Sequence, residues 1–225
     1  MILFLIFFLF VFVLPKFWLS NAMKKNDEEL MNMPFTAEEF GQIILKENNL
    51  SDVKIEETEQ VDHYDLHDKT VRVQQGRLAK KSLTSLTIIC HEIGHAIQHK
   101  EEYGPLVRRT SLVERTQWIS KFGGVILYSG LPLILATGSF GLIKVCLLLV
   151  LISVLLGVFI HLITLDVEID ASFNRAMPIL EEKIPTEYHS QCKNVLQAAA
   201  YTYVIGALTS FLSLRYIWLL LTRLR

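Results

Sequence analysis

The chain has 225 residues, of which 51% are hydrophobic and 20% charged, and long apolar blocks give it the composition of a membrane protein. The formal net charge is −1 at pH 7 and no basic stripe is present, so the composition excludes nucleic acid as a partner. The three cysteines form no Cys-x-x-Cys pair, which excludes a disulfide framework and a cysteine zinc site.

The first 19 residues, MILFLIFFLFVFVLPKFWL, are almost entirely Leu, Phe, Ile and Val. A cleaved signal peptide is the alternative interpretation, because small residues stand at 20–22. Such a peptide carries its positive charge before the apolar run. Here the charges follow, at Lys16, Lys24 and Lys25. We therefore predict an uncleaved transmembrane anchor over residues 1–19, with the next segment in the cytoplasm.

Residues 20–121 have the composition of a soluble domain. Thr36 and Glu39 match a capping box, which begins a helix. Alternating apolar and polar residues are typical of strands, and apolar residues at helical spacing are typical of helices. The predicted elements are a helix at 36–48, strands at 53–57 and 69–74, and a helix at 78–100. The last of these helices carries the stretch HEIGH at 91–95.

Two further apolar blocks follow this domain. Residues 122–165 are long enough for two bilayer crossings of about 20 residues each, and the small polar stretch at 136–139 is suited to the turn between them. Residues 166–194 would then return to the cytoplasm. A last crossing at 195–221 is interrupted by Arg215. Together with the N-terminal anchor, these blocks predict a multi-pass membrane protein.

The stretch HEIGH places two histidines four residues apart. On a helix such residues share one face, with Cβ atoms about 5–6 Å apart, so His91 and His95 can direct their imidazoles at one ion. Glu92 lies beside them and can reach a metal-bound water, as in the His-Glu-x-x-His motif of zinc peptidases. The alternative is a solvated helix face with two histidines. Gly94 disfavours it, since glycine destabilises a helix interior by about 1 kcal/mol relative to alanine, and leaves room beside a metal.

Two histidines do not complete a catalytic zinc site, which has three protein ligands and a water. The extended metzincin motif would place Gly and His where Gln98 and Glu101 stand, so that class is excluded. His99 continues the helix face, but it lies two turns from His91, too far to share the ion with both other histidines.

The segment after the predicted hairpin can supply the third ligand. A chain that leaves the cytoplasm near 122 and returns near 165 brings LDVEIDAS back to the side of the two histidines. Asp166, Glu168 and Asp170 are all candidates by charge. Ser172 stands four residues after Glu168 and could support a ligand side chain by a hydrogen bond. The alternative is that the acidic cluster only marks the membrane boundary.

The motifs HEIGHAIQ and VEIDAS, with DHYD upstream, make the chain resemble the YugP-type zinc-dependent membrane peptidases nearly end to end. It is similar, more loosely, to the HtpX-type membrane metallopeptidases. The resemblance implies that His91, His95 and Glu168 bind Zn²⁺ and that Glu92 is the catalytic base. The HtpX-type enzymes have an acidic residue where Ser172 stands, so this chain departs from their pattern there.

These observations predict a mainly α membrane protein, with about four transmembrane helices and a small α+β zincin-like cytoplasmic domain that carries the His-Glu-x-x-His helix. The predicted function is a membrane-embedded zinc metallopeptidase that hydrolyses peptide bonds at the cytoplasmic face, in a bacterial cell membrane, with Glu92 activating the zinc-bound water. Polypeptides, membrane proteins among them, are the expected substrates, and the lipid bilayer is the other expected partner. The candidates for stabilising the oxyanion are Tyr64, Tyr103, His161 and His189.

Two alternative functions stay open. A site-2-type intramembrane protease would bury the motif in a transmembrane helix, but Lys80, Lys81 and Lys100 leave too few apolar residues between them for a span. A non-catalytic scaffold or regulator stabilised by zinc would close the metal with four protein ligands. The three predicted ligands leave a position for water instead.

Overall fold

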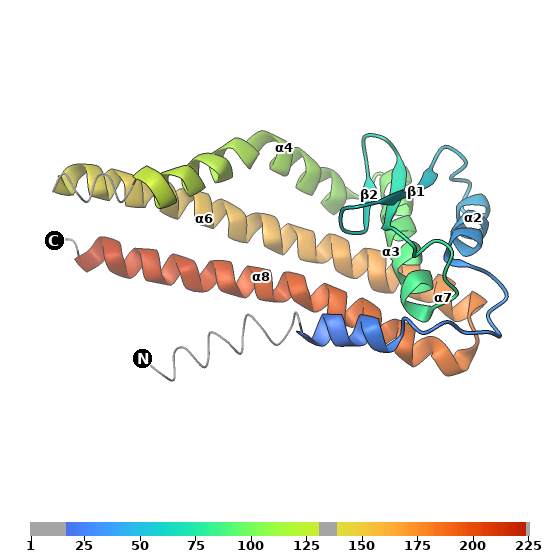
Figure 1. Cartoon of the computed structure of the whole chain (residues 1–225). Helices are drawn as coiled ribbons and strands as arrows, with labels where there is room; N and C mark the ends of the chain where they lie inside the picture. Colours follow the sequence, from blue (N-terminus) through green and yellow to red (C-terminus); the bar gives the residue numbers. More distant parts are fainter. Residues whose placement is uncertain (1–16, 131–138, 224–225) are drawn as a thin grey trace. The chain divides into compact units, whose positions relative to one another are not determined.

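The structure, a computed structural model, describes residues 17–130 and 139–223 (Figure 1). The chain divides into two compact units. We call Met1–Leu106 with Asp166–Thr202 the first unit, and Val107–Leu165 with Tyr203–Arg225 the second unit. The elements in chain order are a helix at 17–25, α2 (Ala37–Glu47), β1 (Lys54–Thr58), β2 (His63–Asp65), β3 (Thr70–Gln74), α3 (Leu83–Lys100), α4 (Gly104–Val125), the π-helix η1 (Ile126–Gly130), α6 (Phe140–Ile169), the π-helix η2 (Asp170–Ala176), α7 (Met177–Lys183), the 3₁₀ helix η3 (Thr186–Tyr188) and α8 (His189–Arg223).

Helix α2 begins at the predicted capping box. The Thr36 hydroxyl accepts a hydrogen bond from the Glu39 backbone N–H at 3.2 Å, and Glu39 Oε2 accepts one from the Thr36 N–H at 2.8 Å. Phe40 and Ile44 are fully buried, so α2 turns this face to the core. The prediction of a helix here is confirmed.

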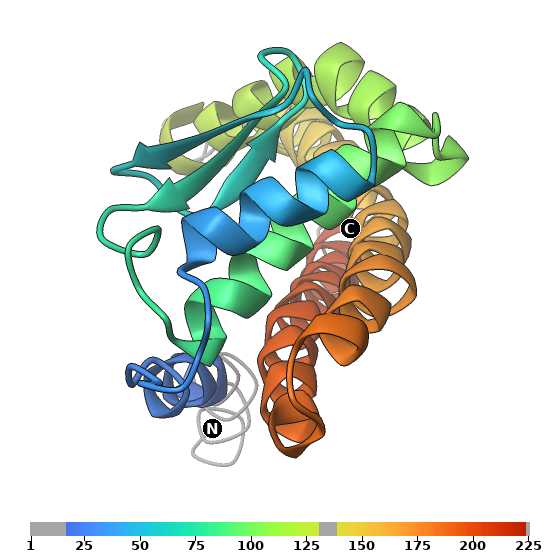
Figure 2. The same ribbon diagram turned by 90° about the vertical axis from the view of Figure 1, so that its right-hand side faces the viewer.

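A three-stranded sheet has the order β1-β3-β2, with β1 parallel and β2 antiparallel to β3. The central strand β3 buries Val71 and Val73. Helices α2 and α3 pack against each other and against this sheet (Figures 1 and 2). The two predicted strands are confirmed as β1 and β3, each shifted by one residue at its start. Strand β2 lies in the stretch DHYD.

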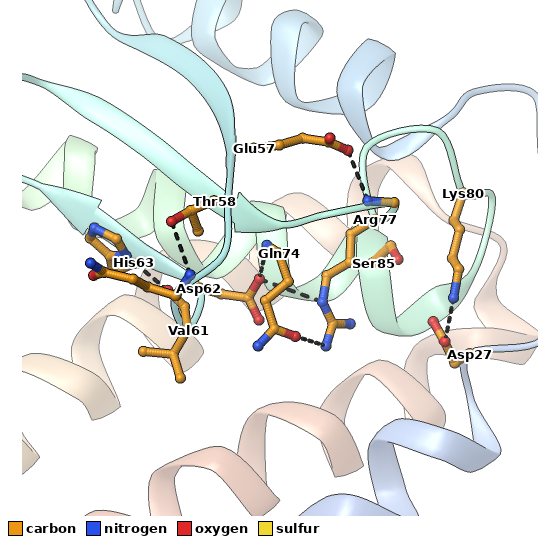
Figure 3. Close-up of polar contacts among 12 residues, drawn as sticks. Asp27, Glu57, Thr58, Val61, Asp62, His63, Gln74, Arg77, Lys80 and Ser85 are labelled. Carbon is orange, nitrogen blue, oxygen red and sulfur yellow. Dashed lines mark hydrogen bonds and ion pairs between the residues drawn. The ribbon is translucent and has the colours of Figure 1, made fainter.

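Side-chain contacts hold the segments that connect the sheet to α3. Asp62, which follows β1, accepts a hydrogen bond from the Gln74 N–H at 2.7 Å and lies 3.5 Å from Arg77 Nε (Figure 3). Lys80 Nζ donates to Asp27 Oδ2 at 2.6 Å (Figure 3). These contacts tie the ends of β1 and β3, and the segment before α2, to the chain that enters α3.

Helix α3 is the central helix of the first unit, and most of its residues are buried. The Ser82 hydroxyl caps it by accepting a hydrogen bond from the Ser85 N–H at 3.2 Å. The predicted start at residue 78 is therefore wrong, because the chain is still in a turn and an extended stretch before Ser82. The helix ends at Lys100, as predicted.

The prediction of about four transmembrane helices is wrong. Within residues 17–130 and 139–223, one helix, Gly141–Lys183, is long and apolar enough to cross a membrane. Charges from Arg108 to Lys121 interrupt α4, and the first half of the predicted hairpin runs from the end of α4 into residues 131–138, which lie outside the described part of the chain. The described residues therefore give no support for a multi-pass protein, and the chain is mostly helical with one small sheet.

Two parts of the membrane prediction lie outside the described residues. Most of the N-terminal anchor falls in residues 1–16, and most of the proposed hairpin turn falls in residues 131–138. The helix at 17–25 is the described continuation of the first block.

The apolar helix keeps its large side chains exposed. In its most apolar stretch, only 17% of the residues are buried. A core helix of a soluble protein would bury such residues, whereas contiguous exposed apolar surface marks contact with a membrane or a partner. The exposed residues recur every three or four positions along α6 and are Leu142, Val145, Leu148, Leu149, Ile152, Leu155, Phe159 and Leu162.

Candidate metal centre

Three side chains that can bind a metal converge in the first unit. Helix α3 presents His91 and His95 on one face, with ring centroids 4.7 Å apart. The last turn of α6 brings Glu168 to them. Glu168 Oε2 lies 3.3 Å from His91 Nε2 and 3.6 Å from His95 Nε2. The ligand atoms of these three side chains all lie within 4.8 Å of one another. Among the described residues, they are the group of His, Cys, Asp or Glu side chains that could hold a metal ion.

The spacing of these atoms suits a tetrahedral ion. Zinc bonds to histidine nitrogen and carboxylate oxygen are about 2.0–2.2 Å long, so two ligand atoms at tetrahedral corners lie about 3.4 Å apart. The distances from Glu168 Oε2 to the two imidazoles, 3.3 and 3.6 Å, match this edge. Two nitrogens and one carboxylate oxygen are also the donor types that zinc takes in catalytic sites. The residues therefore fit zinc and leave the fourth corner to water or substrate.

A glycine allows the two ligand-bearing segments to approach. A Cβ atom at Gly94 would lie 2.8 Å from the Ala171 carbonyl oxygen, closer than real Cβ contacts come. The space beside Gly94 is thus filled by the backbone of η2, and the prediction that it leaves room beside a metal needs this correction. Because Ala171 follows Glu168 by three residues, the close approach sets the position of Glu168 against α3.

The outer nitrogen of each imidazole has a polar partner. His91 Nδ1 lies 3.2 Å from Ser172 Oγ, and His95 Nδ1 lies 2.9 Å from Gln98 Oε1. Both Nε2 atoms therefore face Glu168. Such partners orient a metal ligand and fix which nitrogen is free to bind. Ser172 therefore lies within hydrogen-bond distance of His91, one of the predicted ligands.

The other two acidic candidates, Asp166 and Asp170, do not point at the histidines. Asp170 accepts hydrogen bonds from Gln98 Nε2 at 2.8 Å, from Arg175 Nε at 2.7 Å and from Asn174 Nδ2 at 3.0 Å. Asp166 is exposed. Of the three candidates, the structure brings Glu168 alone into the described group with the histidines.

Residues 1–222 match the protein family described as "Putative neutral zinc metallopeptidase". The chain belongs to this family. It is also 33% identical over 213 residues to "Putative membrane protease YugP" of Bacillus subtilis (strain 168), and the match covers 91% of each chain. No solved structure matches it. The predicted resemblance to YugP-type peptidases is confirmed, and zinc is the metal that membership of this metallopeptidase family implies.

The electrostatics of the metallopeptidase motif follow from burial. Glu92 is 6% exposed, and this burial raises the pKa of its carboxyl, an effect that His91 and His95 partly offset. Burial alone would lower the pKa of His95, but its hydrogen bond to Glu168 and the charge of that carboxylate outweigh it and raise the pKa to about 9. Without a metal, His95 therefore carries its second ring proton and is a positively charged imidazolium at neutral pH.

The candidates for oxyanion stabilisation have other contacts. The Tyr64 hydroxyl lies 2.9 Å from His99 Nδ1, one turn beyond His95, and burial raises the Tyr64 pKa to about 12. His189 Nε2 donates to the Ile184 carbonyl at 2.8 Å. The Arg175 guanidinium lies over the ring of Tyr103, 5.5 Å from its centroid. His161 belongs to the second unit, where its ring is 3.1 Å from the Cβ position of Gly206.

Proposed function

We propose that this chain is a zinc-dependent metalloendopeptidase in which His91, His95 and Glu168 bind Zn²⁺ and Glu92 is the general base. The observation that carries the proposal is the placement of a carboxylate oxygen 3.3 and 3.6 Å from two imidazole Nε2 atoms. Three ligands leave the ion open to water, whereas a structural zinc site is closed by four. The arrangement thus favours catalysis over a zinc-stabilised scaffold.

In peptide hydrolysis the three ligands would hold the metal, and Glu92 would transfer the protons. When bound, zinc supplies a Lewis acid that acidifies water and polarises a carbonyl. Glu92 takes the proton of the water that attacks the peptide carbonyl, and it passes this proton to the leaving amine as the C–N bond breaks. A carboxyl that must both accept and release a proton near neutral pH works best with a raised pKa, and burial of Glu92 acts in this direction.

We also propose that hydrolysis takes place at a membrane, with the site on the cytoplasmic face. Three observations support the location: the relative is named a membrane protease, α6 exposes a long apolar stripe, and Lys24 and Lys25 follow the N-terminal block. Glu168 stands on the same helix as the stripe. Polypeptides that reach the membrane surface, including membrane proteins, are the proposed substrates. The site-2 alternative is disfavoured because α3 packs among α2 and the sheet.

The test compares Glu92→Gln with the wild type and with Glu102→Gln, an exposed glutamate just after the same helix. All three proteins should bind one zinc, because neither glutamate is a proposed ligand. Cleavage of unfolded casein should fall by about 10²–10⁴-fold in Glu92→Gln, which is the usual contribution of general acid–base catalysis. It should stay at the wild-type level in Glu102→Gln.

Two outcomes would overturn the proposal. Full activity of Glu92→Gln would remove this residue from the mechanism. A wild-type protein that binds stoichiometric zinc, yet cleaves no polypeptide in detergent or in vesicles, would favour the scaffold.

A further inference from the structure

We infer that Gln98 is a positioning residue, which selects Nε2 of His95 as the metal-binding nitrogen and locks the ligand helix α3 to the segment that carries Glu168. The inference rests on the proposed function, since it takes His95 and Glu168 as ligands. From the sequence alone, Gln98 indicated only that the extended metzincin motif is absent.

Gln98 is a fully buried amide with three polar partners. Its exposed fraction is 0%, and a buried polar side chain is stable only when its hydrogen bonds are made. Nε2 donates to the Val167 carbonyl at 2.9 Å and to Asp170 Oδ2 at 2.8 Å. Oε1 lies 2.9 Å from His95 Nδ1. All polar atoms of the amide are therefore engaged.

The partners determine which way the amide faces. A backbone carbonyl and a carboxylate can only accept hydrogen bonds, so the NH₂ group must point at Val167 and Asp170. The amide oxygen is then left to face His95. An amide oxygen only accepts, so His95 Nδ1 must carry the hydrogen in this bond. The lone pair of the neutral imidazole is thereby confined to Nε2, the atom that faces Glu168.

Further contacts hold the amide in place from the other side. Asp170 is fixed by Arg175 Nε at 2.7 Å and Asn174 Nδ2 at 3.0 Å, and a second nitrogen of Arg175 donates to Glu101 Oε2 at 2.6 Å. Glu101 directly follows α3, while Asp170 and Arg175 belong to η2. The two anchors of the Gln98 NH₂ group, Val167 and Asp170, flank Glu168 in sequence. One side chain thus fixes two of the three proposed ligands relative to each other.

Two substitutions separate positioning from mere space filling. Gln98→Met keeps nearly the same volume but removes every hydrogen bond, while Gln98→Glu, as a protonated carboxyl, keeps an acceptor for His95 Nδ1 and a donor for Asp170. If Gln98 only filled space, the apolar Met would be tolerated and the buried carboxylate would be harmful. The positioning role predicts the reverse order of zinc affinity, because a buried carboxyl beside Asp170 stays protonated, so that it still accepts from His95 Nδ1 and donates to Asp170.

The readouts are zinc affinity by chelator competition, the visible spectrum of the Co²⁺-loaded protein and the melting temperature of the metal-free protein, all on the full chain in detergent. Gln98→Met should bind zinc about 10–100-fold more weakly and show a changed cobalt spectrum. Gln98→Glu should stay within about tenfold of the wild type. The matched control is Gln42→Met, at an exposed glutamine on α2, which should change none of the three readouts.

Should Gln98→Met fail to fold, Gln98→Asn replaces it, since the shorter side chain keeps an amide but withdraws it from His95. Wild-type zinc affinity and cobalt spectrum in either folded variant would overturn the inference. His95→Ala separates this failure from failure of the proposed function. If His95→Ala loses zinc while the Gln98 variants keep it, only the positioning role is wrong; if the wild type and His95→Ala bind zinc alike, the proposed ligand set is wrong.

Discussion

Replacing Gly94 by alanine should push apart the two segments that hold the proposed ligands. The new Cβ would lie 2.8 Å from the Ala171 carbonyl oxygen and 3.4 Å from its carbonyl carbon, whereas ordinary contact begins at 3.4 Å. The atom it meets belongs to backbone, which cannot rotate away as the end of a side chain can. Helix α3 and η2 must therefore separate, and Glu168 moves with η2.

The effect on folding and the effect on zinc should differ in size. Overpacking a tight contact destabilises a protein by about 1–3 kcal/mol, and the change from glycine to alanine in a helix offsets about 1 kcal/mol of this. The metal-free protein should thus lose up to about 2 kcal/mol. A metal site tolerates shifts of only about 0.2 Å in its ligand distances, so zinc affinity should fall by about 10–100-fold, as when the support of a ligand is lost.

Two other glycines provide matched controls for the same chemical change. A Cβ at Gly41 would meet Ile89 Cδ1 at 2.6 Å and Ile55 Cδ1 at 2.8 Å, which are the ends of flexible side chains away from the metal centre. A Cβ at Gly141 would meet nothing within 4 Å. We expect Gly41→Ala to change the melting temperature but not zinc affinity, and Gly141→Ala to lower neither.

The assay is chelator competition for zinc beside thermal unfolding of the metal-free proteins. Wild-type zinc affinity in Gly94→Ala would refute the reasoning, and so would an equal loss of affinity in Gly41→Ala. The first result would mean that the backbone contact does not set the position of Glu168. The second would mean that any strain in the first unit reaches the site.

Three further predictions follow from the metal centre. Because the His95 pKa is about 9 without metal, zinc must displace a proton, so chelator competition should show affinity rising about tenfold from pH 7 to 8 and levelling above pH 9. The same raised pKa of His95 stabilises the metal-free fold, and this stabilisation is complete below about pH 6.5, so the melting temperature should fall as the pH rises through about 9. If zinc affinity and melting temperature both stayed constant from about pH 7 to 9, the raised pKa of His95 would be contradicted. Ser172→Ala should weaken zinc binding about tenfold by removing the partner of His91 Nδ1, and Ser172→Asp should restore it; equal affinities would show that Ser172 gives no support. Zinc-to-protein ratios after dialysis should fall sharply in Glu168→Ala but not in Asp166→Ala, whose side chain is exposed, and the opposite order would reassign the third ligand.

Secondary structure could be predicted from the sequence where neighbouring residues alone determine it. The capping box of Thr36 and Glu39 and the alternation of β1 and β3 depend on neighbours within a few residues, and both are confirmed. The helical spacing of His91 and His95 likewise required no tertiary knowledge. The predicted number of membrane spans was wrong, because the length of an apolar block does not show how many spanning helices it forms; among the described residues, only Gly141–Lys183 is long and apolar enough for a span.

Contacts between distant segments were beyond the reach of the sequence. The glycine in the middle of α3 was interpreted as room beside a metal, because nothing local indicates that the backbone of Ala171 fills this space. Gln98 carried no signal as a ligand support, since its partners Val167 and Asp170 lie on another helix. The sequence left Asp166, Glu168 and Asp170 as candidates by charge, and in the structure Glu168 lies beside the histidines; its role as a ligand stays a prediction.

The first unit is formed by two stretches of chain that are synthesised at different times. The ribosome releases the histidines of α3 well before the residues of α6, and at about 5–20 residues per second Glu168 follows about 4–15 seconds later. During that interval the nascent chain holds two proposed metal ligands and the proposed base, but not the carboxylate of Glu168. The proposed site of a newly made molecule is therefore incomplete until its long apolar helix has been synthesised, so translation itself delays the proposed peptidase activity until that helix exists.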